Sequence, residues 1–241
     1  MQPRVQLRVP VPALGGGAFR AAVAETEALL GADAWPTYTL SNHDFPRHIT
    51  RYRAGGDTDA RARVAAMMLL SLRGTPFLYY GEEIGMPNVE ITRERIRDCV
   101  GRDGCRTPMQ WRVAPHGGFT SAHEPWMSCG DFTRVSVDRQ ANDPDSLLSF
   151  YRRMIALRRN SPALREGSYR CIADAPDDCF VYARETSTQR ILVALNFSGL
   201  PRDVRVARGT ILLSTLGSRA GQDIDGVLSL APNQAAIIAL R

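Results

Sequence analysis

The stretch TYTLSNHDFPR, residues 37–47, decides how the rest of the chain is interpreted. It begins as an apolar, β-prone run and ends abruptly in Asn42, His43 and Asp44. A buried strand whose carboxyl end opens into a site has this pattern, and Pro46 ends its hydrogen-bonded ladder. In an α/β barrel, polar residues at the carboxyl ends of strands lie at the mouth where chemistry takes place. The same residues are also compatible with a plain turn that the aspartate caps.

The composition excludes several classes of protein. The chain has 241 residues, of which 44% are hydrophobic and 23% charged, as in an ordinary globular protein. Its net charge is +5 and every basic residue is arginine, but these are spread along the chain, so no nucleic-acid partner is expected. No apolar run approaches the ~18 residues of a membrane span. The amino terminus lacks the apolar core of a signal peptide.

The five cysteines are irregularly spaced and form neither a C-x-x-C pair nor a Cys/His zinc pattern. Mostly reduced thiols and a cytoplasmic location are expected. We predict no metal and no cofactor.

Helical and strand patterns alternate in the first part of the chain. Each predicted strand ends in polar or glycine-rich residues, which is the βαβ rhythm of a parallel sheet. Residues 87–144 show little periodicity, and loops of this length are often functional. The predicted elements are a helix over 19–30, a strand over 37–40, a helix over 61–73, a strand over 75–80 and a helix over 147–159.

From about Ser168 the pattern changes to short strands separated by turn residues, which is typical of a small antiparallel sandwich. These strands are predicted at 180–184, 191–197, 204–206, 210–213, 227–230 and 235–240. The sequence therefore predicts two domains, residues 1–164 and residues 165–241.

Three motifs together resemble the α-amylase family of glycoside hydrolases, in its α-glucosidase and oligo-1,6-glucosidase branch. They are SNHDFPR at residues 41–47, GTPFLYYGEEIGM at 74–86 and GRDGCRTPMQW at 101–111. Residues 143–153 are similar to the family's last barrel helix. The resemblance implies an incomplete (β/α)8 TIM barrel, reduced to its last strands and helices, followed by a C-terminal antiparallel β-sandwich domain.

The resemblance also implies what is absent. In this family the nucleophilic aspartate and the acid/base glutamate lie on the fourth and fifth barrel strands, and the Asn-His-Asp motif ends the seventh. The chain is therefore expected to be the carboxyl-terminal part of an α-glucosidase-like enzyme, without the N-terminal barrel portion and inactive alone. Its unpaired strand edges should promote oligomerisation. The alternative is a non-catalytic homologue that serves as a carbohydrate-binding or scaffold subunit.

The motif match assigns roles to five residues. Asp44 corresponds to the family's third carboxylate, which stabilises the transition state by binding hydroxyls of an α-glucoside or oligosaccharide. His43 would hold the same hydroxyl edge. Arg102 resembles the arginine that clamps the bound glucose, and Arg106 a nearby pocket residue; both could instead be structural ion pairs. Arg47 would pair with Asp44 or line the pocket entrance.

Two further features of the sequence bear on the site. Without the family, Asp44 with Glu82 or Glu83 could pass for a catalytic pair, because all three follow predicted strands. The resemblance makes the Gly-Glu-Glu turn mainly structural. Arg112 departs from the family, which commonly has an acidic residue after Gln-Trp, and this puts a local polar contact near the entrance in doubt.

Overall fold

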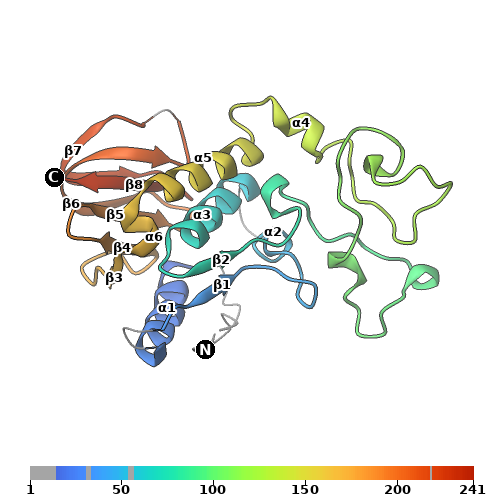
Figure 1. Cartoon of the computed structure of the whole chain (residues 1–241), viewed down its shortest axis with the longest axis horizontal. Coiled ribbons are helices and arrows are strands. Elements are labelled where there is room, and N and C mark those ends of the chain that lie inside the picture. The colour runs from blue at the N-terminus through green and yellow to red at the C-terminus, as the bar shows by residue number, and fades with distance from the viewer. Residues whose placement is uncertain (1–14, 31–33, 54–56, 218) are drawn as a thin grey trace. The chain divides into compact units, whose positions relative to one another are not determined.

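The computed structural model describes residues 15–30, 34–53, 57–217 and 219–241 (Figure 1). Residues 1–8, where we expect no signal peptide, lie outside this set. The described chain divides into two compact units that interleave in sequence. Unit 1 takes its residues from 1–38, 55–77 and 153–241, and unit 2 consists of 39–54 and 78–152. The predicted boundary between residues 164 and 165 stays a prediction.

The helix and strand rhythm predicted for the first part of the chain is confirmed. The elements are α1 (Gly16–Leu30), β1 (Thr37–Thr39), α3 (Thr58–Ser71) and β2 (Thr75–Phe77). The amide of Thr75 donates to the carbonyl of Pro36 at 2.8 Å. Both strands therefore begin at the same end of their two-stranded sheet, as in a parallel pair. Among the described residues this sheet does not close into a barrel.

Helix α3 is the buried helix of unit 1. Its N-cap is Asp57, whose side chain accepts hydrogen bonds from the amides of Asp59 and Ala60 at 3.0 and 3.1 Å. Every residue from Val64 to Ser71 is buried, because the helix packs against β5 and β8 of the sheet below.

The antiparallel region predicted after residue 165 is one six-stranded sheet in the order β3-β4-β5-β8-β6-β7 (Figure 1). All of its pairings are antiparallel. Its strands are β3 (Ser168–Cys171), β4 (Cys179–Glu185), β5 (Arg190–Asn196), β6 (Arg202–Ser214), β7 (Asp223–Leu230) and β8 (Ala235–Leu240).

Strand β6 corrects the two short strands predicted over 204–206 and 210–213. It is a single strand with register shifts between Val206 and Gly209 and between Ile211 and Leu213. Such bulges bend a strand, so the first part of β6 pairs with β7 and the later part with β8. The bend lets Val204 share one core with Val181 of β4.

Unit 2 is mainly irregular, as predicted for residues 87–144. Its core contains Ile84, Met86, Met109 and Leu148, with partly buried residues of 135–141 packed around them. Its short elements are α2 (His48–Arg51), η1 (Glu82–Ile84), η2 (Arg93–Arg95), η3 (Asp103–Cys105), η4 (Pro115–Gly118) and α4 (Val137–Ala141).

Helix α5 (Leu147–Asn160) continues the chain from unit 2 into unit 1, and α6 (Pro162–Glu166) follows it. The predicted helix over 147–159 is thereby confirmed. No helix among the described residues combines the length and the apolar character needed to cross a bilayer.

Candidate active site

Asp44 lies on a tight turn that Asn42 builds. The Oδ1 atom of Asn42 accepts hydrogen bonds from the amides of Asp44 at 2.8 Å and Phe45 at 3.1 Å. This is the local side-chain turn that asparagine favours. Just beyond it, the Oγ atom of Ser41 accepts from the amide of His48 at 2.9 Å. The turn is therefore fixed on both sides of Asp44.

Two arginines converge on one oxygen of Asp44. The Nη1 atom of Arg102 donates to Oδ1 at 2.8 Å, and the Nη2 atom of Arg106 lies 3.4 Å from the same atom. The Nε2 atom of His43 lies 3.6 Å from Oδ2. The side chain of Asp44 is 30% exposed and that of His43 is 68% exposed. The structure thus brings together four of the five residues that the sequence singled out.

Asp98 holds Arg102 from the other side, and the sequence analysis missed it. Its Oδ1 atom accepts from Nη2 of Arg102 at 2.7 Å, and its Oδ2 atom accepts from Nε at 2.9 Å. The backbone amide of Arg102 donates to Oδ2 as well, at 2.8 Å. This two-point contact fixes the plane of the guanidinium. The spacing of four residues between Asp98 and Arg102 was the signal that could have revealed it.

The neighbouring arginines lower the pKa of both carboxylates, Asp44 and Asp98. Partial burial raises the pKa of Asp44, but the hydrogen bond from Arg102 and the positive charges of His43, Arg102 and Arg106 outweigh it. The pKa of Asp44 is therefore held below its usual range. The hydrogen bonds from Arg102 lower the pKa of Asp98 further, to well below its usual range. Both groups are anions at neutral pH.

Arg106 ties the turn to the loop that carries the third motif. Its Nε atom donates to the carbonyl oxygen of His43 at 2.7 Å. The neighbouring Cys105 is buried, with its Sγ atom 3.6 Å from the same carbonyl oxygen. These contacts fix the backbone beside Asp44 through residues that are 62 and 63 positions after His43 in the chain.

Arg47 does not take the place that the sequence predicted. Its side chain is fully buried and donates from Nη1 to the carbonyl of Tyr80. The guanidinium carbon lies 4.9 Å from the ring centre of Tyr79 and 4.6 Å from that of Tyr80. This stacking turns Arg47 inward, so it neither lines an entrance nor pairs with Asp44 in the contacts described.

The two glutamates of the Gly-Glu-Glu turn have surroundings that differ from those of Asp44. Glu82 is buried, with its Oε1 atom 3.5 Å from Nδ1 of the buried His48. Burial raises the pKa of Glu83, whose side chain reaches a pocket described next. Glycines with positive φ, Gly81 at 82° and Gly85 at 72°, flank the pair and let the chain turn tightly.

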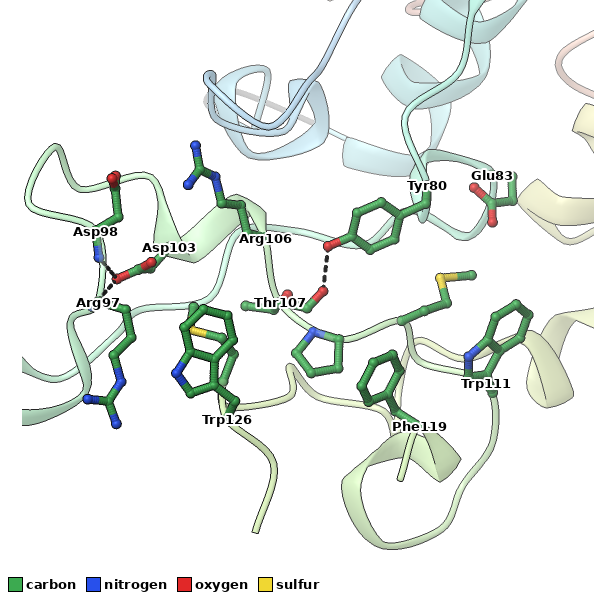
Figure 2. Close-up of a pocket in the computed structure, with 13 residues that line it drawn as sticks. Tyr80, Glu83, Arg97, Asp98, Asp103, Arg106, Thr107, Trp111, Phe119 and Trp126 are labelled. Carbon is green, nitrogen blue, oxygen red and sulfur yellow. Dashed lines mark hydrogen bonds between the residues drawn. The ribbon is translucent and has the colours of Figure 1, made fainter. Parts of the chain in front are cut away.

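A cavity of about 620 Å³ adjoins the site within unit 2 (Figure 2). Arg106 and Asp98 line it, so it shares two residues with the group around Asp44. The other lining residues are mostly apolar or aromatic; they are Tyr80, Glu83, Arg97, Asp103, Thr107, Pro108, Met109, Trp111, Phe119, Trp126 and Met127. Over the described part of the chain, no group of three or more His, Cys, Asp or Glu residues could hold a metal ion.

Known proteins match most of the chain. Residues 9–167 match the family described as alpha amylase, catalytic domain. A probable oligo-1,6-glucosidase of Bacillus subtilis is 31% identical over 86% of the chain, and a probable alpha-glucosidase of Rhizobium meliloti is 36% identical over 69%. The crystal structure of the trehalulose synthase MutB from Pseudomonas mesoacidophila superposes on 96% of the chain with a TM-score of 0.86 and 29% identity.

The chain spans less than half of each of these relatives. It covers 42% of the Bacillus protein, 32% of the Rhizobium protein and 47% of the trehalulose synthase. The family match nevertheless extends over well more than half of the chain and includes the turn and loop that form the Asp44 site. The chain therefore belongs to the alpha-amylase family of glycosidases.

Proposed function

We propose that this chain is the carboxyl-terminal part of an α-glucosidase-like enzyme that cleaves terminal α-glucosidic bonds with retention of configuration. In this proposal Asp44 accepts hydrogen bonds from two neighbouring hydroxyls of the terminal glucosyl ring. His43 binds the same edge, and Arg102 and Arg106 keep the carboxylate charged and oriented. Hydrogen bonds of this kind strengthen as the ring distorts toward the oxocarbenium-like transition state.

One observation carries the proposal. The carboxylate of Asp44 is gripped at Oδ1 by two arginines, yet its side chain remains 30% exposed beside an exposed His43. A carboxylate used only as a structural ion-pair partner has no need for this exposure. An oriented, solvent-facing anion next to an imidazole is suited to a polyhydroxy ligand.

The catalytic carboxylates are proposed to lie outside this chain. A retaining glycosidase needs a nucleophile and an acid/base group on either side of the scissile bond. In the family that the chain resembles, both are expected before the Asn-His-Asp motif, which supports this proposal. Neither Glu82, which is buried against His48, nor Glu83 is assigned this role.

Binding of a simple glucoside tests the assignment of Asp44. The 241-residue chain is titrated with methyl α-D-glucopyranoside by calorimetry or ligand-observed NMR. We expect weak binding that Asp44→Asn reduces about 10- to 100-fold, because the loss of one charged hydrogen bond costs about 1.5–3 kcal/mol. The control variant is Asp174→Asn, since Asp174 is an exposed carboxylate of unit 1. Equal binding by the Asp44 variant and the parent chain contradicts the proposal.

Turnover tests the location of the catalytic pair. The chain alone should release no 4-nitrophenol from 4-nitrophenyl α-D-glucopyranoside and no glucose from maltose or isomaltose. Release that disappears in Asp44→Asn would show that the chain carries a complete site. If the chain binds these sugars without turnover, and Asp44→Asn binds them equally well, the alternative is favoured. That alternative is a carbohydrate-binding or scaffold subunit.

A further inference from the structure

A buried polar group closes the loop that carries Asp44. Its members, Ser41, His48 and Glu82, all belong to unit 2, and none is more than 2% exposed. The Oγ atom of Ser41 lies 3.1 Å from Nδ1 of His48, and Oε1 of Glu82 lies 3.5 Å from the same nitrogen. Burying polar groups is costly unless they are paired, so this group needs a physical explanation.

The group is not a catalytic triad. In a triad the histidine contacts the nucleophile with one ring nitrogen and the acid with the other. Here Ser41 and Glu82 both approach Nδ1, whereas Nε2 of His48 has no hydrogen-bond partner among the described residues. All three side chains are also closed to solvent, so none of them can meet a substrate. A role in support of the neighbouring loop fits these contacts better.

The contacts favour a proton on Nδ1 of His48. A proton there has two acceptors within reach, Oγ of Ser41 and the carboxylate of Glu82, whose negative charge attracts it. A proton on Nε2 alone would be a buried donor without an acceptor. It would also leave the lone pair of Nδ1 facing the carboxylate of Glu82. The carboxylate thereby selects the form of the ring that donates toward Ser41.

With its proton on Nδ1, His48 holds the two ends of the loop together at two points. The backbone amide of His48 donates to Oγ of Ser41 at 2.9 Å, and Nδ1 lies 3.1 Å from the same oxygen. A hydroxyl oxygen has two lone pairs, so it can accept both bonds at once. Between these ends lies Asn42, whose side chain accepts from the amide of Asp44. The position of Asp44 therefore depends on a histidine four residues later in the chain.

We propose that His48 is a positioning residue for Asp44, and that Glu82 determines which ring nitrogen of His48 carries the proton. The Nδ1 proton fixes Ser41 and thereby the loop that presents Asp44. The carboxylate of Asp44 is then aligned before a ligand arrives, which lowers the entropy cost of binding. The effect on ligand binding rests on the proposed function, whereas the location of the proton does not.

The location of the proton is measured on the parent chain without a ligand. Long-range proton–nitrogen correlation spectra of the chain, labelled with ¹⁵N in its histidine rings, distinguish a protonated ring nitrogen from a bare one. Single alanine variants of the other three histidines, none of which is buried, assign the signals of His48 by elimination; they are His43, His116 and His123.

We expect a proton on Nδ1 of His48 at neutral pH. In Glu82→Gln the share of rings protonated at Nε2 should rise, because the negative charge beside Nδ1 is gone. A parent chain in which His48 carries its proton on Nε2 alone would overturn the proposal. An unchanged ring in a folded Glu82→Gln variant would overturn the role given to Glu82.

Two substitutions of His48 separate the roles of its two nitrogens. An asparagine places its amide near the position of Nδ1, and a glutamine reaches toward that of Nε2. His48→Asn should bind methyl α-D-glucopyranoside within about twofold of the parent chain, whereas His48→Gln should bind it about fivefold more weakly. Ser41→Ala should resemble His48→Gln, because it removes the shared acceptor. Calorimetry measures binding, and circular dichroism checks that each variant is folded.

The matched control is His123, which is exposed in a loop of the same unit. Both His123→Asn and His123→Gln should bind the glucoside like the parent chain. Equal binding by folded His48→Asn and His48→Gln would overturn the proposal, whether both match the parent chain or both fall short of it. If neither variant folds, the proton measurement on the parent chain still decides the proposal.

The two proposals fail separately. If Asp44→Asn binds methyl α-D-glucopyranoside as well as the parent chain does, the role assigned to Asp44 is wrong, and the proton on His48 is still measured without a ligand. If Asp44→Asn loses binding but the two His48 variants bind alike, only the positioning role of His48 is wrong.

Discussion

At the scale of single residues, the site depends on a chain of alternating charges. Asp98 holds Arg102 at two atoms, and Arg102 in turn donates to Asp44. Asp98 is only 12% exposed at its side chain, whereas Asp44 faces solvent more openly. Arg102 therefore lies between a better-shielded anion, Asp98, and a more exposed one, Asp44.

The lowered pKa of Asp98 predicts how stability should depend on pH. A carboxyl group with a depressed pKa in the folded state stabilises the fold above its unfolded pKa of about 3.9. That contribution is lost as pH falls through the lower, folded value. Asp98→Asn should therefore lower the melting temperature most at pH 6–7, and its difference from the parent chain should shrink at about pH 3. Thermal melts across this range measure the difference.

Glu90→Gln provides the comparison, because Glu90 is an exposed carboxylate of the same unit. This variant should show little difference from the parent chain at any pH. A melting-temperature difference for Asp98→Asn that is constant with pH would mean that the carboxylate charge of Asp98 is not what stabilises Arg102.

Sequence reasoning reached part of this site. The motifs indicated that His43, Asp44, Arg102 and Arg106 belong together, and the structure brings them together. Arg47 lies four residues after His43 and was predicted as another site residue, but its planar side chain stacks on two tyrosine rings and is buried. Spacing along the chain cannot show whether an arginine will contact the site or stack on nearby aromatic rings.

At the scale of elements, a local residue determines where helix α3 begins, and tertiary packing determines which of its faces are buried. Asp57 is of a residue type that favours the start of a helix, and it is the N-cap of α3. The burial of the helix on nearly all sides has no clear signal in its periodicity, because the residues include polar ones such as Ser71. Packing against β5 and β8 decides it.

The cap of α3 gives a prediction at this scale. Asp57→Ala removes the acceptor of two backbone amides at the start of the helix. The free energy of unfolding should fall by about 1 kcal/mol. Asp57→Asn keeps an acceptor oxygen and should cost much less. Urea unfolding of the three chains measures this, and equal losses in the two variants would show that the charge of Asp57, rather than its hydrogen bonds, is what counts.

The sequence pattern did not predict that β6 is one continuous strand. Its two apolar runs looked like two strands because the residues between them break the alternation. The structure joins them through register shifts on either side of Gly209. A Cβ atom at Gly209 would lie 2.4 Å from the carbonyl oxygen of Ala239, so the close approach of β8 requires glycine there.

At the scale of the whole molecule, the sequence predicted the two kinds of architecture but not how the chain is shared between compact units. The family match and the antiparallel sheet agree with the predicted fold class. The interleaving of the units depends on contacts between segments distant in sequence, and no local pattern records these.

The two-stranded sheet gives a prediction for the whole chain. Among the described residues, β1 and β2 each have a strand neighbour on one side only, and Phe77 of β2 is 50% exposed. An exposed apolar edge strand is a template for association. We expect the chain to self-associate, and Phe77→Lys to shift it toward monomer in sedimentation velocity at equal concentration.

Leu200→Lys is the matched control, because Leu200 is 58% exposed in a loop of unit 1 and away from the two-stranded sheet. A parent chain that sediments as a monomer would contradict the prediction. The same holds if both variants reduce association equally.

The discontinuity of unit 1 has a consequence for how this protein is made on the ribosome. Helix α3 is made before the strands of the sheet that it packs against, and the last of these, β8, ends at Leu240. At typical rates of translation, α3 waits on the order of ten seconds for that surface. Until β5 and β8 are made, the nascent chain exposes the apolar residues of α3 that are buried in the folded protein, so we expect chaperones to bind this helix.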